Sequence, residues 1–90
     1  MRTIYKYPLS IKDEIKVRMP HNAQVLTIQV QHDVPCIWAM VDTAAEKVTR
    51  KFAVRGTGHD CQDMPANAFV GTFQMHGGAL VFHLFDLGER

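Results

Sequence analysis

The chain has 90 residues, of which 47% are hydrophobic and 21% charged, with a formal net charge of +1. This composition is typical of one globular domain over residues 1–90 and excludes a disordered or fibrous chain. The scattered Lys and Arg residues form no basic stripe for duplex nucleic acid, and no apolar run approaches the roughly 20 residues that span a bilayer. Residues 1–10 lack the apolar stretch of a signal peptide, so we expect an intracellular protein whose two cysteines, Cys36 and Cys61, stay reduced.

Hydrophobic residues mostly recur at every second position, which is the period of half-buried β-strands. In chain order, the pattern predicts strands over residues 2–8, 14–19, 24–31, 35–42, 48–55, 68–75 and 79–85. The third strand should turn Leu26, Ile28 and Val30 toward the core. Both alternate sets of the fourth strand are apolar, so this strand is predicted to be central and covered on both faces, with Trp38 on the second face.

The connections between these strands are short. Residues 43–47 are too few to hold a helix alone and are expected to form a hairpin connection. Residues 60–67, which include Pro65, form an irregular segment with room for one short helical turn. His76-Gly77-Gly78 is expected to close a hairpin whose inward residues are Phe69, Phe73, Met75, Leu80, Phe82 and Leu84.

The elements together predict a mostly β fold with little helix. About six or seven strands joined mostly by short links favour a small antiparallel β-sandwich or barrel, connected largely as a meander. A chain of this size with apolar residues on both sides of a strand is expected to cover one face with another subunit, as a dimer or larger homo-oligomer.

The segment Arg55-Gly56-Thr57-Gly58-His59 is the least ordinary loop in the chain. Its two glycines could let backbone N–H groups converge on an anion, and Arg55, Thr57 and His59 would add charge or hydrogen bonds. The alternative is a plain structural turn, because Gly-X-Gly commonly follows a strand and the known phosphate-loop patterns are missing.

The sequence gives less support to a metal site or a catalytic site. His59 and Cys61 lack the spacing of a zinc site, and the single serine, Ser10, lies outside any nucleophile motif, so we expect no metal, no cofactor and no catalytic residues. Trp38 is either a core aromatic or the floor of a pocket that stacks a ring. Trp38 could face a surface of neutral polar groups that suits either a small polar ligand or a second subunit. The residues of this surface would be Thr27, Gln29, Thr72, Gln74 and His83.

Several short runs resemble a family of small uncharacterised proteins of tailed bacteriophages and prophages. They are residues 4–9, 19–20, 37–42, 56–59, 71–74 and 80–85, and they span nearly the whole chain. The resemblance implies no activity, because the family is known only as a domain of unknown function. It does imply a phage accessory protein in the cytoplasm of the host cell, where some small phage proteins sequester nucleotide immune signals; this is an analogy.

Three hypotheses follow from the sequence. The first is a non-enzymatic protein that sequesters a small nucleotide-type ligand, with Gly56 to His59 taking phosphate, Trp38 or a tyrosine stacking the base, and Thr72 and Gln74 nearby. The second is an interaction module that inhibits a host protein through a β-sheet face or edge. An enzyme is the third.

Overall fold

The computed structural model describes residues 1–89. They form seven strands and two single turns of 3₁₀ helix. The strands are β1 (Arg2–Pro8), β2 (Glu14–Pro20), β3 (Gln24–Gln31), β4 (Val34–Asp42), β5 (Lys47–Gly56), β6 (Phe69–Met75) and β7 (Leu80–Glu89), and the turns are η1 (Ala66–Ala68) and η2 (His76–Gly78). The predicted mostly β fold, with little helix, is confirmed.

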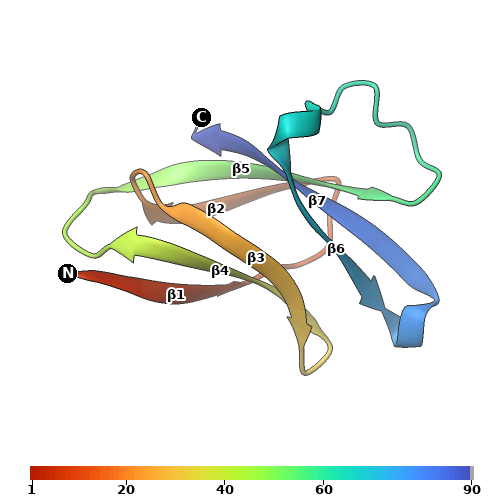
Figure 1. The fold of residues 1–90 in the computed structure, drawn as a ribbon, viewed down its shortest axis with the longest axis horizontal. Coiled ribbons are helices and arrows are strands. Elements are labelled where there is room, and N and C mark those ends of the chain that lie inside the picture. The colour runs from red at the N-terminus through yellow and green to blue at the C-terminus, as the bar shows by residue number, and fades with distance from the viewer. Residues whose placement is uncertain (90) are drawn as a thin grey trace.

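The strands form two antiparallel sheets that pack as a sandwich (Figure 1). One sheet has the order β1-β4-β3 and the other β2-β5-β7-β6. Only β3–β4 and β6–β7 are hairpins, and the chain changes sheet after β1, β2 and β4. The expected meander is therefore wrong, as is the hairpin predicted at residues 43–47, which instead carry the chain from β4 to β5 in the other sheet.

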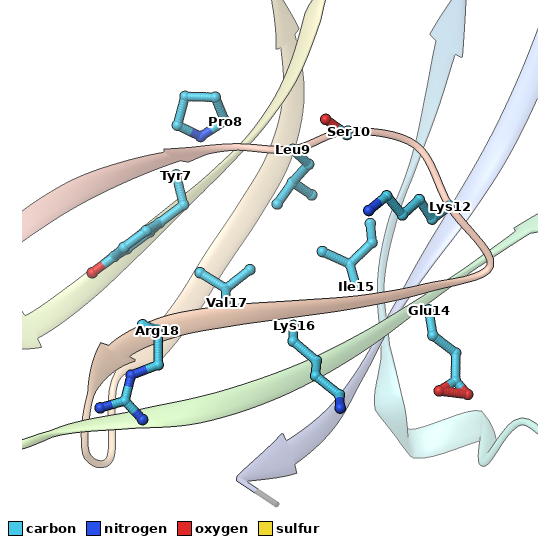
Figure 2. Close-up of a pocket in the computed structure, with 10 residues that line it drawn as sticks. All are labelled: Tyr7, Pro8, Leu9, Ser10, Lys12, Glu14, Ile15, Lys16, Val17 and Arg18. Atoms are coloured by element: carbon cyan, nitrogen blue, oxygen red, sulfur yellow. The ribbon is translucent and has the colours of Figure 1, made fainter.

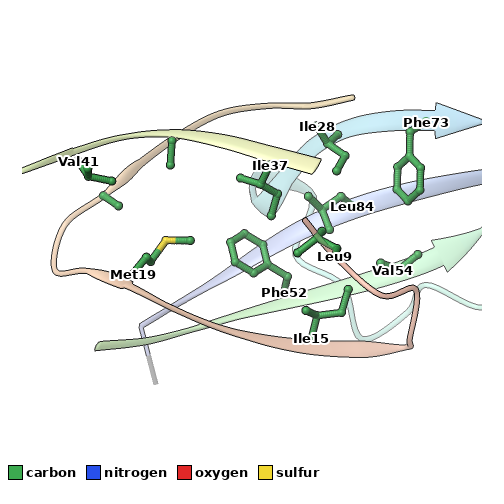
Figure 3. Packing of buried hydrophobic residues seen from close by; sticks show 12 residues of the cluster. Leu9, Ile15, Met19, Ile28, Ile37, Val41, Phe52, Val54, Phe73 and Leu84 are labelled. Atoms are coloured by element: carbon green, nitrogen blue, oxygen red, sulfur yellow. The ribbon is translucent and has the colours of Figure 1, made fainter. Parts of the chain in front are cut away.

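The core lies between the two sheets, where the inner residues of each strand interdigitate (Figure 3). Phe52, Met19, Ile37 and Leu84 are completely buried there. β4 is the central strand of its sheet, as predicted, but the prediction that it is covered on both faces is wrong, because only one face packs on the core. Its second face, with Trp38, points away from the core, and there only Cys36 is fully buried, while Trp38 and Met40 are half-buried.

Three register shifts interrupt the strand pairing, and two of them, in β3 and β6, reverse side-chain directions that the sequence pattern predicts. The register of β3 shifts between Val25 and Thr27, so Leu26 points outward and is 40% exposed. A second shift in β6, between Phe69 and Gly71, turns Phe69 outward, where it is 50% exposed and packs edge-on against Phe85. The inward positions predicted for Leu26 and Phe69 are wrong for this reason. Leu80 is also more exposed than predicted, because it begins β7 at the end of its sheet.

One side of the sandwich is closed by β3 and β6. Gly71 of β6 lies so near β3 that a Cβ atom at this position would come within 2.9 Å of Ile28 Cγ2. Real Cβ atoms do not approach another heavy atom this closely, so the absence of a side chain at Gly71 allows the two strands to meet.

One end of the core is closed by a charged network that ties β7 to the β2–β3 turn. The Arg50 guanidinium donates to both carboxylate oxygens of Asp86, at 3.0 and 2.7 Å, and to the carbonyl of Ala23 at 2.7 Å. The hydrogen bond to Asp86 raises the pKa of Arg50. Glu89 accepts the Asn22 backbone N–H at 2.7 Å, and this bond lowers the pKa of its carboxyl.

Candidate functional site

The loop after β5 is a tight turn, and two of its backbone N–H groups already donate hydrogen bonds to backbone carbonyls. The His59 N–H donates to the Gly56 carbonyl at 3.0 Å, and Gly58 has a φ of 87°, the geometry of a type II turn that favours glycine at its third position. The Thr57 N–H donates to the Val81 carbonyl at 3.1 Å. An anion-binding nest needs successive N–H groups aimed at one point. This geometry favours the structural alternative for the loop.

The His59 ring packs against the backbone of Gly56. A Cβ atom on Gly56 would lie 2.9 Å from His59 Cε1, so the glycine permits this contact. His59 itself is exposed. The imidazole thus covers the turn from outside.

Arg55 is the anchor of the segment that follows the turn. Its guanidinium forms an ion pair with Asp63 at 3.2 Å and donates to the carbonyls of Asp13 at 3.1 Å and Val54 at 3.0 Å. Only 16% of its side chain is exposed. Arg55 therefore holds the irregular segment against the outer face of the four-stranded sheet, where that segment and Leu87 cover Ala53.

His83 joins two of the predicted site residues. Its Nε2 lies 2.8 Å from Thr57 Oγ1, and its Nδ1 lies 2.9 Å from Thr72 Oγ1. Thr72 and Arg55 are its direct cross-strand neighbours on β6 and β5. We call His83, Thr57 and Thr72 the imidazole cluster. The sequence predicts His83 only as one polar residue of an outward face, and its contact with Thr57 depends on the pairing of β7 with β5, which is distant in the sequence.

Gln74 lies on the same outer face as the imidazole cluster, opposite Val81 on β7. The structure therefore brings Arg55, Thr57, Thr72 and Gln74 to one face of the four-stranded sheet. Gly56, Gly58 and His59 lie at its edge, in the turn.

Trp38 lies on the other side of the sandwich, on the outer face of the three-stranded sheet. Its cross-strand neighbours are Lys6 and Thr27, and Gln29 lies opposite Cys36 on the same face. Because the two outer faces point in opposite directions, the surface expected to combine Trp38, Thr27 and Gln29 with Thr72, Gln74 and His83 is divided into two. Within one chain, Trp38 and the turn at Gly56 belong to different sheets.

We call the outer face of the three-stranded sheet around Ile4, Trp38 and Met40 the Trp38 face. Ile4 lies directly opposite Met40 and is 53% exposed. The Arg2 guanidinium donates to Met40 Sδ at 2.8 Å. These side chains, with Thr3, border a hollow of about 420 Å³. The face has an apolar centre with charged and amide groups at its rim, where Lys6 Nζ donates to Gln31 at 2.9 Å.

Metal-binding groups do not gather in the described part of the chain. Residues 1–89 contain no cluster of three or more His, Cys, Asp or Glu side chains that could hold an ion. Cys36 and Cys61 are both free thiols, the first buried and the second exposed. None of the helices over the same residues is long and apolar enough to cross a bilayer.

Comparison with known proteins identifies a family. A model named "Domain of unknown function (DUF7352)" matches residues 1–90, so the chain belongs to this family. No curated protein matches significantly, and no solved structure does.

Proposed function

We propose that this member of the DUF7352 family is a non-catalytic protein-binding module that uses the Trp38 face. The observation that carries the proposal is the grouping of Ile4, Trp38 and Met40 on a sheet face that points away from the core. Trp and Met are enriched in protein interfaces, and binding energy concentrates at large apolar side chains surrounded by a polar rim. In the phage setting that the resemblance implies, the partner is a host protein that the contact inhibits.

The proposal is tested with single charges placed on the face. Ile4→Glu should abolish capture of a stoichiometric partner from host lysate without changing the fold, because Ile4 is exposed. Leu80→Glu is the matched control, since it places the same charge at an exposed apolar residue of the other sheet. Equal capture by the Ile4 variant, or loss of capture in both variants, would contradict the proposal.

A second proposal is the sequestration of a small nucleotide-type ligand on the outer face of the four-stranded sheet. It is favoured by the imidazole cluster, which places two hydroxyl groups on one His83 ring beside Arg55. Here hydrogen bonds from this cluster replace the phosphate contact expected of the Gly56 turn. Calorimetric titration with cyclic dinucleotides and ADP-ribose derivatives should then give binding that Thr72→Val weakens. Uniform absence of heat would refute this second proposal.

A further inference from the structure

The side of the sandwich between β1 and β2 is open. β1 pairs only with β4 and β2 only with β5, so each presents a free edge on the same side of the molecule. Between them lies a hollow of about 550 Å³ (Figure 2). We call this the β1–β2 hollow.

The hollow has an apolar interior. Ile15 and Val17 point into it from β2, toward Tyr7 and Leu9 (Figure 2). Leu9 and Ile15 are buried at its base, whereas Tyr7 and Val17 are half-buried nearer its opening. Burial raises the pKa of the Tyr7 hydroxyl. Because Val17 and Tyr7 are only half-buried, an apolar side chain of a bound partner would bury further apolar surface against them.

Positive charge concentrates along the same side. Residues 12–18 hold three of the ten Lys and Arg residues and two of the nine Asp and Glu residues. Lys12, Lys16 and Arg18 border the hollow together with one carboxylate, Glu14. That carboxylate is already paired with Lys51 Nζ at 3.0 Å. The Arg18 guanidinium donates to Thr49 Oγ1 at 3.3 Å and to the Lys47 carbonyl at 3.0 Å, so Lys12 and Lys16 are the cations of this edge without such bonds to neighbouring strands among residues 1–89.

The position of Lys16 on β2 lowers the stability of the fold. It lies directly opposite Lys51 on β5, and like charges at directly opposed positions destabilise a sheet. Lys51 turns to Glu14, so Lys16 has no ion pair among residues 1–89. An anionic group that arrives beside β2 would provide the missing partner.

From these observations we infer that the β2 edge binds an extended peptide segment in which acidic and apolar residues alternate. Successive side chains of a strand point to opposite faces, so a strand added beside β2 would turn its apolar residues to Val17 and its acidic residues to Lys16 and Arg18. A second copy of this chain is disfavoured as the occupant, because the cationic edges would repel each other. Single-stranded nucleic acid would use the cations but leave the β2 backbone unpaired. This site is separate from the Trp38 face.

The inference is tested with a labelled peptide of about eight residues in which Glu and Val alternate, long enough to pair with β2. We expect saturable binding by fluorescence polarisation and new protection of β2 amides from hydrogen exchange. Lys16→Glu should weaken binding about tenfold or more, because it reverses a charge that faces the peptide. Lys6→Glu is the matched control, since it makes the same change of net charge on the outer face of the other sheet, and should retain binding.

Several results would overturn the inference. One is equal binding of a peptide with the same composition but with its Glu residues grouped, since charge alone would then explain the affinity. Another is tighter binding of an oligothymidylate of about ten nucleotides than of the peptide, which would indicate a nucleic-acid site. Protection of β2 through dimer formation without peptide would identify a second copy as the occupant, and failure to bind the peptide would exclude the site.

Discussion

The approach of β6 to β3 at Gly71 can be tested by adding one methyl group. In Gly71→Ala the new Cβ would lie 2.9 Å from Ile28 Cγ2, well inside ordinary contact. Ile28 is only 4% exposed, and Cγ2 is attached directly to its Cβ, so the contact cannot be relieved by moving the end of a flexible side chain. Overpacking of this kind costs about 1–3 kcal/mol of unfolding free energy.

Two further variants separate this clash from a general effect of replacing glycine. Gly56→Ala would create the same 2.9 Å approach, but to the exposed ring of His59, which can swing away. We expect it to change stability by less than about 1 kcal/mol in either direction. Ile28→Leu removes the methyl group at Cγ2 while keeping the side-chain volume, and should alone cost less than about 1.5 kcal/mol.

The assay is urea unfolding, read as the midpoint at constant slope. Gly71→Ala with Ile28→Leu should be more stable than the sum of the single effects by roughly 0.5–3 kcal/mol, as expected for residues in contact. If Gly71→Ala were no more costly than Gly56→Ala, or if Ile28→Leu gave no recovery, β3 and β6 would not meet as the structure describes.

Three further predictions concern charge and thiol chemistry. Arg50→Met should destabilise the protein by roughly 2–3 kcal/mol in urea unfolding, less than the loss of one partner from a fully buried pair, because it leaves the partly buried Asp86 carboxylate unpaired. The pKa of Glu89 is lowered in the folded state, so its contribution is present above the ordinary carboxyl pKa and is lost as pH falls through the folded value. Glu89→Gln should therefore lower the melting temperature at pH 7, with the difference closing in acid; an equal difference at both pH values would refute this. A thiol reagent should label Cys61 rapidly in the native state and Cys36 only on unfolding, and simultaneous labelling would show that Cys36 is accessible.

The strand segments were predictable because their signal is local. Period-two alternation marks β2 and the hairpin strands, and the glycines of His76-Gly77-Gly78 indicate the hairpin loop, where both take positive φ. The side-chain directions of Leu26 and Phe69 were not predictable, because a bulge inserts one residue and reverses the alternation beyond it. Gly71 adjoins the β6 bulge, and glycine inside a strand often marks such a position, whereas no residue type marks the bulge in β3.

The assignment of strands to sheets was also beyond the sequence pattern. Alternation shows that Trp38 and His83 each lie on the face of their strand that is turned away from the core. It does not show that these two faces belong to different sheets. The imidazole cluster likewise depends on hydrogen bonds from His83 to residues 26 and 11 positions away. Such relations are fixed by packing of the whole core, so the sequence could propose candidate residues but could not show which of them share a face.

The repeated passage of the chain from one sheet to the other has a consequence for folding kinetics. β1 must wait for β4, with Arg2 opposite Asp42, and β2 must wait for β5, with Glu14 opposite Ala53. Only the β3–β4 and β6–β7 hairpins can form from neighbouring segments, on the order of 1–10 μs. The remaining strand pairs must close loops of many residues, and this loss of chain entropy comes before the stabilising contacts form. Folding on the order of milliseconds to seconds is therefore expected. During that interval the edges of β4 and β5 are unpaired, and the nascent chain is most exposed to association with other chains.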